Sequence, residues 1–515
     1  MRPSYGMRAE VSATRAPLPT FVYDMPMTDG PWREERLLID GKLSDSSSGS
    51  TFDNVNPATA QVLGVTADGT GVDMDAAIAA ARRAFDGTDW SRNLAARLRG
   101  LRQLQEALVR HQEDLRATIV AEVGSPLSGT YGAQLDAPVA ALSWVIDLAE
   151  RYGWESDLGR SEPFGVPTQR WVWREAIGVV GAITPWNYPL QINLAKVGPA
   201  LAAGCTVVLK PAPDTPWSGT LLGRLVAEET DIPPGVFNVV VSSDHSVGQQ
   251  LAEDPRVDMV SFTGSTRTGQ AVMRAGASNL KKVFLELGGK SALVVLDDAD
   301  METAAATAAF QVMSHAGQGC AITSRLLLPR TRYDEGVAAV VTMMGALAYG
   351  DPTDPNVYMG PLINQRQRER VLGYIRQAID QGATVATGGG VPEHLPEGFF
   401  VEPTALAGVE PEHIVAQEEV FGPVLAILAH DGDDDAVRIA NGTPYGLSGG
   451  VISADRDRTM AVARRMRTGT IGCNGGVWYG PDVPFGGYGH SGIGREMGVA
   501  GFEEYLETKS VAEPA

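Results

Sequence analysis

Three motifs in the sequence each hold a side chain that could act on a carbonyl compound. Asn187 stands inside the stretch PWNYP, Glu286 begins the stretch ELGGK, and Cys320 ends the stretch GQGC. A cysteine thiolate can attack a carbonyl carbon, a carboxylate can serve as a general base, and hydrogen-bond donors can stabilise the alkoxide that forms. Glycines beside the cysteine let the backbone approach a ligand with its N–H groups free. Covalent chemistry at a carbonyl carbon is therefore our first hypothesis.

The position of Asn187 after a predicted strand places it at an edge where ligands bind. Residues 179–184 are typical of a buried strand, and the prolines of PWNYP end this strand and begin a turn. In open α/β sheets, ligands bind beyond the carboxyl ends of the strands. A second strand end runs into a helix at residues 262–269, FTGSTRTG, whose small residues and free N–H groups suit a pyrophosphate. Taken alone, this second signal is weak.

Short apolar runs alternate with helical segments from residue 171 onward, which is typical of βαβ units with a mostly parallel sheet. The predicted strands of this first series cover residues 179–184, 206–209, 236–241, 259–262 and 292–296. The helices between them include residues 191–203 and 217–229. Before this series, apolar residues at steps of three and four predict two long amphipathic helices between residues 73 and 124.

A second α/β series follows residue 321. Its predicted strands cover residues 325–328, 424–428, 450–452 and 470–473, and a helix is expected over residues 365–381. The fold class is therefore α/β, with two doubly wound units. Residues 158–176 alternate in character and predict a protruding hairpin, and the C-terminal tail predicts a loose strand. Both are sheet edges that need partners, which favours pairing between subunits.

Length and charge exclude several classes of function. A chain of 515 residues is too long for one hydrophobic core and predicts two or three compact units. The 62 acidic and 42 basic residues give a formal charge of −20, which repels nucleic acid phosphates and anionic lipid headgroups. No uninterrupted apolar run reaches the length of a membrane span. Neither nucleic acid nor a membrane is therefore an expected partner.

The cysteines and histidines favour neither a disulfide framework nor a metal centre. Cys205, Cys320 and Cys473 are odd in number and far apart, which predicts a reducing, cytoplasmic location. The 7 histidines lack the spacing of metal ligands, so no metal site is expected. Residues 1–30 contain no apolar signal-peptide core and predict a disordered N-terminal extension, with a transit peptide as the alternative.

The order of these motifs along the chain resembles that of the aldehyde dehydrogenase superfamily. The likeness extends from about Leu37 to Lys509. It includes further matches at VVLKP, residues 207–211, at EEVFGP, residues 418–423, and at PFGG, residues 484–487. Taken alone, Cys320 would more often be a buried structural thiol. The accompanying motifs favour a nucleophile instead.

The resemblance implies how the domains divide the chain. A Rossmann-like, cofactor-binding domain is expected over residues 31–157 and 177–287, and a catalytic domain over residues 288–485. An oligomerisation hairpin and tail strand are expected over residues 158–176 and 498–511. This arrangement implies a homodimer or a homotetramer.

The resemblance also implies a role for each of the three side chains named first. Cys320 is the nucleophile, which forms a thiohemiacetal and, after hydride loss, a thioester. Asn187 and the backbone N–H of Cys320 hold the oxyanion, and Glu286 activates the water that hydrolyses the thioester. Relatives that pass the acyl group to coenzyme A generally lack this glutamate, so a free carboxylic acid is the expected product. A coenzyme A-acylating dehydrogenase and a catalytically silent scaffold are the alternatives.

A binding site for NAD is implied as well. Its residues are Ile183, Trp186, Lys210, Gly264, Ser265, Gly269, Glu419 and Phe421. Members that prefer NAD usually carry a glutamate three residues after the lysine, where the carboxylate repels the 2′-phosphate of NADP. Pro213 stands at that position here, and Asp214 follows it. We expect NAD as the main cofactor, with NADP tolerated. Gly489 is a second departure, since many members carry lysine there.

The resemblance places a substrate pocket beside the nucleophile. Its expected lining includes Tyr188, Gln191, Ile192, Ser314, Tyr479 and Phe485. Aromatic walls suit apolar aldehydes, and the small residues Ala195 and Ser314 widen the pocket for long, branched or ring-bearing ones. No arginine in this set could hold a substrate carboxylate, which disfavours short semialdehyde acids. A small aldehyde, apolar or bulky, is the expected substrate.

Overall fold

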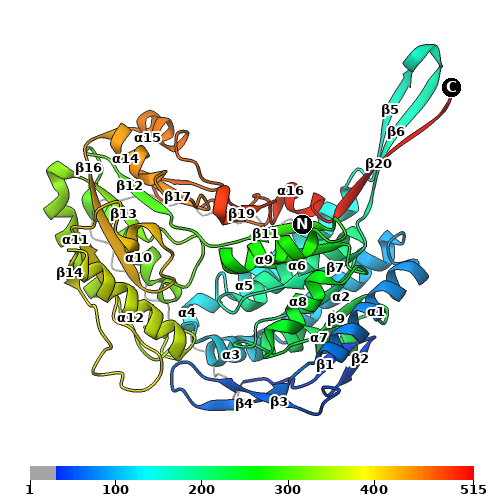
Figure 1. Ribbon diagram of the computed structural model, residues 1–515, viewed down its shortest axis with the longest axis horizontal. Helices are drawn as coiled ribbons and strands as arrows, with labels where there is room; N and C mark the ends of the chain where they lie inside the picture. Colours follow the sequence, from blue (N-terminus) through cyan, green and yellow to red (C-terminus); the bar gives the residue numbers. More distant parts are fainter. Residues whose placement is uncertain (1–30) are drawn as a thin grey trace, which may run out of the picture.

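The computed structural model describes residues 31–515. Two α/β units lie side by side, and a narrow antiparallel sheet projects from one of them (Figure 1). The predicted N-terminal extension, residues 1–30, lies outside the described residues. Within residues 31–515, no helix combines the length and the hydropathy needed to cross a membrane.

The first unit is built on an eight-stranded sheet in the order β19-β11-β10-β7-β8-β9-β1-β2. The five strands from β11 to β9 in this order run parallel. The chain order reverses between β7 and β10, and such a reversal leaves a crevice at the carboxyl ends of the two strands. The strands are β1 (Leu37–Ile39), β2 (Lys42–Ser44), β7 (Val179–Ile183), β8 (Thr206–Lys210), β9 (Phe237–Val239), β10 (Met259–Thr263), β11 (Lys282–Glu286) and β19 (Gly492–Ile493).

Helices cover both faces of this sheet, because successive strand residues point to opposite faces. Val179 and Val208 pack with α1, α8 and α9, whereas Val180 and Val207 pack with α2, α3, α5, α6 and α7. The helices are α1 (Gly71–Gly87), α2 (Leu94–Arg110), α3 (Gln112–Val123), α4 (Leu127–Thr130), α5 (Asp136–Arg151), α6 (Pro189–Ala203), α7 (Trp217–Glu229), α8 (His245–Glu253) and α9 (Thr266–Gly276).

The segment predicted as two long helices, residues 73–124, contains three. A break at His111 separates α2 from α3. The imidazole of His111 lies 2.8 Å from a carboxylate oxygen of Glu229 and stacks on Trp32, which holds the break in place. The apolar spacing continues across the break, so the sequence pattern alone does not reveal it.

The second unit is built on a seven-stranded sheet in the order β14-β15-β16-β13-β12-β17-β18. β12, which was grouped by its pattern with the first series of strands, belongs to this sheet. β14 and β15 were not predicted, because β14 is largely exposed and β15 is rich in alanine. The strands are β12 (Ala292–Val295), β13 (Arg325–Pro329), β14 (Thr384–Thr387), β15 (Thr404–Ala407), β16 (Val424–His430), β17 (Gly449–Ile452) and β18 (Gly472–Cys473). The helices are α10 (Met301–Met313), α11 (Tyr333–Ala346), α12 (Gln365–Asp380), α13 (Ile414–Gln417), α14 (Asp433–Ala440) and α15 (Arg456–Ala463).

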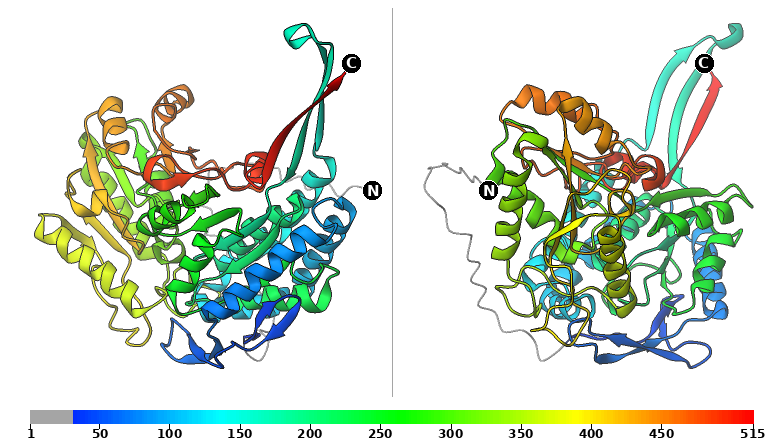
Figure 2. Two further views of the ribbon diagram at one scale, coloured as in Figure 1. Left: turned by 45° about the vertical axis from the view of Figure 1, so that its right-hand side comes forward. Right: turned by 60° about the vertical axis from the view of Figure 1, so that its left-hand side comes forward.

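The projecting sheet has three antiparallel strands (Figure 2). β5 (Glu155–Ser161) and β6 (Thr168–Ala176) form a hairpin, which starts before the predicted residue 158. β20 (Leu506–Pro514) pairs with the whole length of β6. A separate two-stranded sheet joins β3 (Thr51–Val55) to β4 (Val62–Ala67).

The predicted tail strand, residues 498–511, differs from the structure in its first part. Residues Gly498–Glu503 form the short helix α16, and the strand begins only at Leu506. Phe502 is 1% exposed and packs edge-on against Tyr152 and Trp154. Burial of the Phe502 ring against the first unit accompanies a helix here, although the loosely alternating polar and apolar residues of the tail suggested a strand.

Candidate active site

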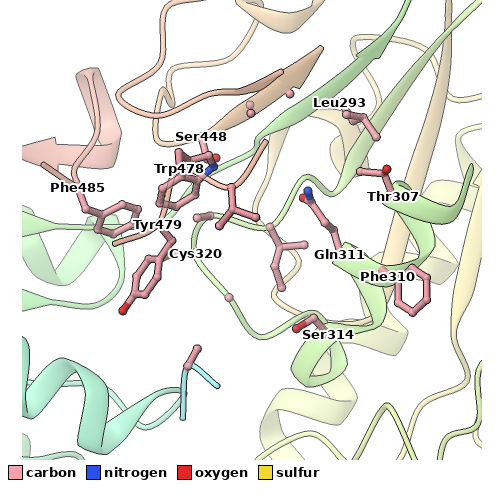
Figure 3. A pocket seen from close by; sticks show the side chains of 18 of the residues that line it. Leu293, Thr307, Phe310, Gln311, Ser314, Cys320, Ser448, Trp478, Tyr479 and Phe485 are labelled. Atoms are coloured by element: carbon pink, nitrogen blue, oxygen red, sulfur yellow. The ribbon is translucent and has the colours of Figure 1, made fainter. Parts of the chain in front are cut away.

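A cavity of about 780 Å³ is lined by residues of both α/β units. Asn187, Glu286 and Cys320, which are far apart in sequence, all line this cavity. Figure 3 shows Cys320 on a loop, with α10 on one side of the cavity and the aromatic side chains Trp478 and Phe485 on the other. The folding of the chain thus brings a thiol, a carboxyl group and an amide to one enclosed space.

A tight loop carries Cys320 to the cavity. Directly after α10, His315, Ala316 and Gly317 have φ values of 46°, 52° and 71°, all in the left-handed region. A Cβ atom at Gly317 would lie 2.0 Å from the carbonyl oxygen of Gly422, so a larger residue would displace the loop. The turn leaves the Cys320 side chain half-buried at the cavity wall.

Asn187 is held beside the Cys320 loop by hydrogen bonds at both its backbone and its side chain. Its Nδ2 donates to the carbonyl oxygen of Gln318 at 2.9 Å, and its own carbonyl oxygen accepts from Gln134 Nε2 at 2.9 Å. Within residues 31–515, the amide donates no other hydrogen bond. An amide nitrogen carries two protons, so one remains for a ligand in the cavity.

Glu286 ends β11 and is 1% exposed. Among the described residues, its Oε1 has no hydrogen-bond partner. Burial, reinforced by the nearby carboxylate of Glu496, raises the pKa of Glu286 well above its usual range. The ammonium of Lys196 opposes this effect, and it forms a buried ion pair with Glu496 at 2.9 Å. A carboxyl group with a raised pKa and a free oxygen is suited to proton transfer near neutral pH.

The thiol of Cys320 is also disposed to hold its proton. Burial raises its pKa, and the carboxylate of Glu286 raises it further by repelling a thiolate. The thiolate is the reactive form of cysteine. Nucleophilic attack by Cys320 should therefore become faster as the pH rises.

Replacing Glu286 by glutamine is expected to make Cys320 more reactive toward an alkylating agent. The amide carries no charge, so the thiol loses one cause of its raised pKa, and more thiolate forms at a given pH. The rate of Cys320 carboxamidomethylation by iodoacetamide, followed by peptide mass spectrometry from about pH 6 to about pH 10, measures this effect. Cys473, which is half-buried elsewhere, is the internal reference. Identical pH profiles for the wild type and Glu286→Gln would contradict the prediction.

Several of the predicted cofactor residues lie at the carboxyl edge of the eight-stranded sheet. Ile183 and Lys210 end the neighbouring strands β7 and β8, and Trp186 follows in the loop after β7. Gly264 and Ser265 link β10 to α9, where the Ser265 side chain caps the helix by accepting from Thr268 N. Gly269 lies in the second turn of α9, close to Leu287, where a Cβ would be 2.6 Å from a methyl carbon. A strand end followed by a helix N-terminus is suited to bind phosphate.

Glu419 and Phe421 approach this edge from the second unit. Glu419 Oε1 accepts from the backbone N–H of Gly289 at 2.9 Å, and Oε2 lies 2.3 Å from where a Cβ of Gly288 would stand. A side chain at residue 288 would therefore displace the Glu419 carboxylate. Burial raises the pKa of Glu419 to about 7. The Phe421 ring meets Trp186 edge-on, at 5.4 Å between ring centroids.

All six predicted substrate-pocket residues line the cavity: Tyr188, Gln191, Ile192, Ser314, Tyr479 and Phe485. Trp478 and Phe485 stack with 3° between their planes, and Gln191 Nε2 donates to the Tyr479 hydroxyl. Further lining residues from the second unit were not predicted from the sequence: Leu293, Thr303, Thr307, Phe310, Gln311 and Ser448. The spacing of the α10 members at three and four residues is a signal for a common helix face.

A family model described as "Aldehyde dehydrogenase family" matches residues 44–511. A relative from Pseudomonas sp., named 3-succinoylsemialdehyde-pyridine dehydrogenase, is 42% identical over 483 residues. The match covers 92% of this chain and 98% of the relative. The chain is thus similar to that enzyme over almost its whole length.

Solved structures of similar proteins have the same fold. A Mycobacterium tuberculosis aldehyde dehydrogenase complexed with NAD+ has a TM-score of 0.90 at 40% identity, covering 94% of this chain and 98% of that one. A mutant of aldehyde dehydrogenase C from Pseudomonas syringae, complexed with NAD+ and octanal, has a TM-score of 0.89 at 38% identity with the same coverage. With a matching family model, similar relatives and a shared fold over nearly all its residues, the chain belongs to the aldehyde dehydrogenase family.

Proposed function

We propose that this enzyme oxidises an apolar or bulky aldehyde to the carboxylic acid through a thioester on Cys320. The observation that carries this proposal is the meeting of Cys320, Asn187 and Glu286 at one cavity wall. In the first step, the Cys320 thiol releases its proton to water, and the thiolate bonds to the aldehyde carbon while the C=O π electrons move to the oxygen, which becomes an oxyanion. The free N–H of Asn187 Nδ2 and the backbone N–H of Cys320 donate to this oxygen, and one such donor typically lowers the barrier by roughly 3 kcal/mol.

Glu286 then completes the reaction. NAD+, when bound, supplies the acceptor for the hydride whose loss converts the thiohemiacetal to a thioester. The carboxylate of Glu286 takes a proton from water, the hydroxide adds to the thioester carbonyl, and the carbon–sulfur bond breaks to release the acid. The buried ion pair of Lys196 and Glu496 acts on the charge of Glu286. The Glu496 carboxylate raises the pKa of Glu286 and the Lys196 ammonium lowers it, so the pair affects how readily Glu286 takes up the proton. A buried general base beside the thioester favours water over coenzyme A as the acyl acceptor, and the intact set of three groups argues against a silent scaffold.

The chain also has the groups that a dinucleotide needs, and we propose NAD+ as its cofactor. The start of α9 at Ser265 offers backbone N–H groups for a phosphate. Lys210 is buried at the end of β8, and the Glu419 carboxylate is held by the backbone N–H of Gly289. Among the described residues, Thr263 Oγ1 at the end of β10 is buried without a hydrogen-bond partner. Two structural relatives are described as NAD+ complexes.

A preference for NAD+ over NADP+ is expected although Pro213 replaces the usual glutamate. The carboxylate of Asp214 accepts from Asn364 Nδ2 at 2.7 Å, and the charges of Asp214, Asp244 and Asp68 all act on the Lys210 ammonium. These carboxylates would repel a 2′-phosphate. Adding another with Pro213→Glu should widen the preference by about tenfold. The change in preference is measured from kcat/KM and from Kd by fluorescence titration, each determined with NAD+ and with NADP+. A wild-type preference of roughly tenfold for NADP+ would contradict the expected preference for NAD+.

The cavity lining supports a substrate without a carboxylate. Within the described part of the chain, its acidic members are Glu286 and Glu496, and no lysine or arginine contributes to it. The Pseudomonas relative is named for a succinoylsemialdehyde-pyridine, and the Pseudomonas syringae structure is a complex with octanal. We therefore expect octanal and benzaldehyde to exceed succinic semialdehyde in kcat/KM by at least about tenfold. NADH formation measured by absorbance with the three aldehydes tests this ranking, and a higher value for succinic semialdehyde would contradict it.

We further propose that the enzyme is a cytoplasmic homodimer or homotetramer. The projecting sheet of β5, β6 and β20 leaves strand edges unpaired, and the exposed apolar side chains Leu158, Phe164 and Val166 gather on its hairpin. Such edges and apolar residues are suited to pair with another subunit. The three cysteines are free thiols, which fits a reducing compartment.

A further inference from the structure

One wall of the cavity carries a row of polar side chains that the proposed chemistry does not use. Thr303, Thr307 and Gln311 lie four residues apart on α10, and Ser314 follows directly after the helix. Figure 3 shows Thr307, Gln311 and Ser314 on this side, opposite Trp478 and Phe485. The α10 side of the cavity therefore combines these polar side chains with apolar ones such as Phe310, opposite the aromatic pair Trp478 and Phe485.

The amide of Gln311 is fixed in one orientation. Its Oε1 accepts from the backbone N–H of Thr323 at 3.2 Å and from Thr323 Oγ1 at 2.6 Å. Thr323 is 1% exposed, so these two bonds are shielded from water. An amide oxygen accepts two hydrogen bonds, so both acceptor positions are filled. Flipping the amide would place its N–H₂ group against the Thr323 N–H, which makes the observed orientation the stable one.

This orientation turns the N–H₂ group of Gln311 toward the cavity. Within residues 31–515, Nε2 donates to no protein acceptor, although Gln311 lines the cavity. The neighbouring Thr307 hydroxyl donates to the carbonyl oxygen of Thr303 at 2.8 Å, so its proton is already used. Gln311 therefore provides an uncharged donor at this part of the wall.

The chemistry of this position selects the group that it can recognise. Among residues 31–515, no lysine or arginine lines the cavity, whereas Glu286 and Glu496 do, so a carboxylate would be repelled. A keto oxygen or a pyridine nitrogen accepts a hydrogen bond without carrying a charge. Gln311 and Cys320 both line the cavity. An acceptor on the substrate chain, away from the aldehyde carbon, can therefore meet Gln311 while the aldehyde carbon lies at Cys320.

We propose that Gln311 Nε2 recognises an uncharged hydrogen-bond acceptor on the substrate, a keto oxygen or a ring nitrogen on the chain that carries the aldehyde group. Gln311 is a residue for substrate specificity, and Thr323 positions its amide. The inference rests on the proposed aldehyde oxidation and narrows the substrate class to aldehydes that carry such an acceptor. The energy of the contact is gained on binding, so it acts mainly through KM.

A matched pair of aldehydes tests the inference. Nonanal and 4-oxononanal have the same chain length and differ by one keto oxygen. The wild type should favour 4-oxononanal, and Gln311→Met, which keeps a similar size but removes the donor, should lose about tenfold in kcat/KM for 4-oxononanal, mainly through KM. The value for nonanal should change by less than about twofold. Thr323→Val, which removes one of the two bonds to Oε1, should lower the keto preference in the same direction.

Binding without turnover provides an independent readout. In a Cys320→Ala background, calorimetric titration with 4-oxononanal should show about tenfold weaker binding once Gln311→Met is added. Gln377→Met is the matched control, because Gln377 is exposed on α12 and donates only within its own helix. Equal losses for both aldehydes in Gln311→Met, or an unchanged keto preference, would overturn the role of Gln311. Absence of NADH formation from either aldehyde in the wild type would instead overturn the proposed oxidation itself.

Discussion

Cys320→Ala is expected to lower aldehyde oxidation by about four orders of magnitude or more. Without the sulfur, no thiohemiacetal forms, and a direct attack by water has no equivalent means of holding the intermediate for hydride loss. The fold should remain intact, because the side chain is half-buried at a cavity wall and is not part of a core cluster. NADH formation from octanal, followed by absorbance at enzyme concentrations high enough to detect the residual rate, measures the loss.

Cys473→Ala is the matched control for this substitution. Cys473 is also a half-buried free thiol, but it lies on β18 and does not line the cavity. Its replacement should leave kcat/KM within about twofold of the wild type. If Cys320→Ala retained more than about a tenth of the wild-type rate, another nucleophile would have to be sought and the thioester mechanism would be abandoned.

Glu286→Gln is expected to separate the two halves of the reaction. The glutamine keeps the size of the side chain but cannot take a proton from water, so thioester hydrolysis should slow by about 10²- to 10³-fold. Formation of the thioester needs no base at this position, so the first turnover should still release NADH. Rapid-mixing absorbance should therefore show a burst of about one NADH per active site, followed by a very slow steady state.

The burst has a chemical counterpart that can be observed directly. Mass spectrometry of the quenched Glu286→Gln protein should show an acyl group on the peptide that contains Cys320. Glu302→Gln is the control, because Glu302 is exposed in the first turn of α10. A Glu286→Gln enzyme that lacks both the burst and the acyl adduct would place the role of Glu286 before hydride loss and not after it.

Much of the local structure was predictable from short-range patterns. The strand and helix of residues 179–203 follow from an apolar run, a proline-containing turn and helical spacing, and they appear as β7 and α6. The break at His111 and the helix at residues 498–503 were not predictable in this way. Both depend on partners distant in sequence, Glu229 for the first and Tyr152 for the second. Spacing along the chain contains no information about such contacts.

For the site residues too, some features were predictable from the sequence and others depend on contacts between distant segments. The types of Cys320, Glu286 and Asn187, and their positions after strands or beside glycines, predict covalent chemistry at a carbonyl carbon, and the resemblance to the aldehyde dehydrogenase family adds the thioester. The absence of the usual glutamate at residue 213 could also be read from the sequence. Only the structure places the Asp214 carboxylate against Asn364, which lies 150 positions later. The compensating role that we propose for Asp214 therefore rests on a contact between the two units.

Residue types and their spacing predict the chemical groups, the alternation of strands and helices, and the family to which the chain belongs. The surroundings of these groups follow from the tertiary structure. It buries Glu286 next to Glu496 and Lys196, and it turns the Gln311 amide by means of Thr323. The physical reason is that residue type and periodicity are local properties, whereas burial, charge coupling and hydrogen-bond orientation depend on which distant segments pack together.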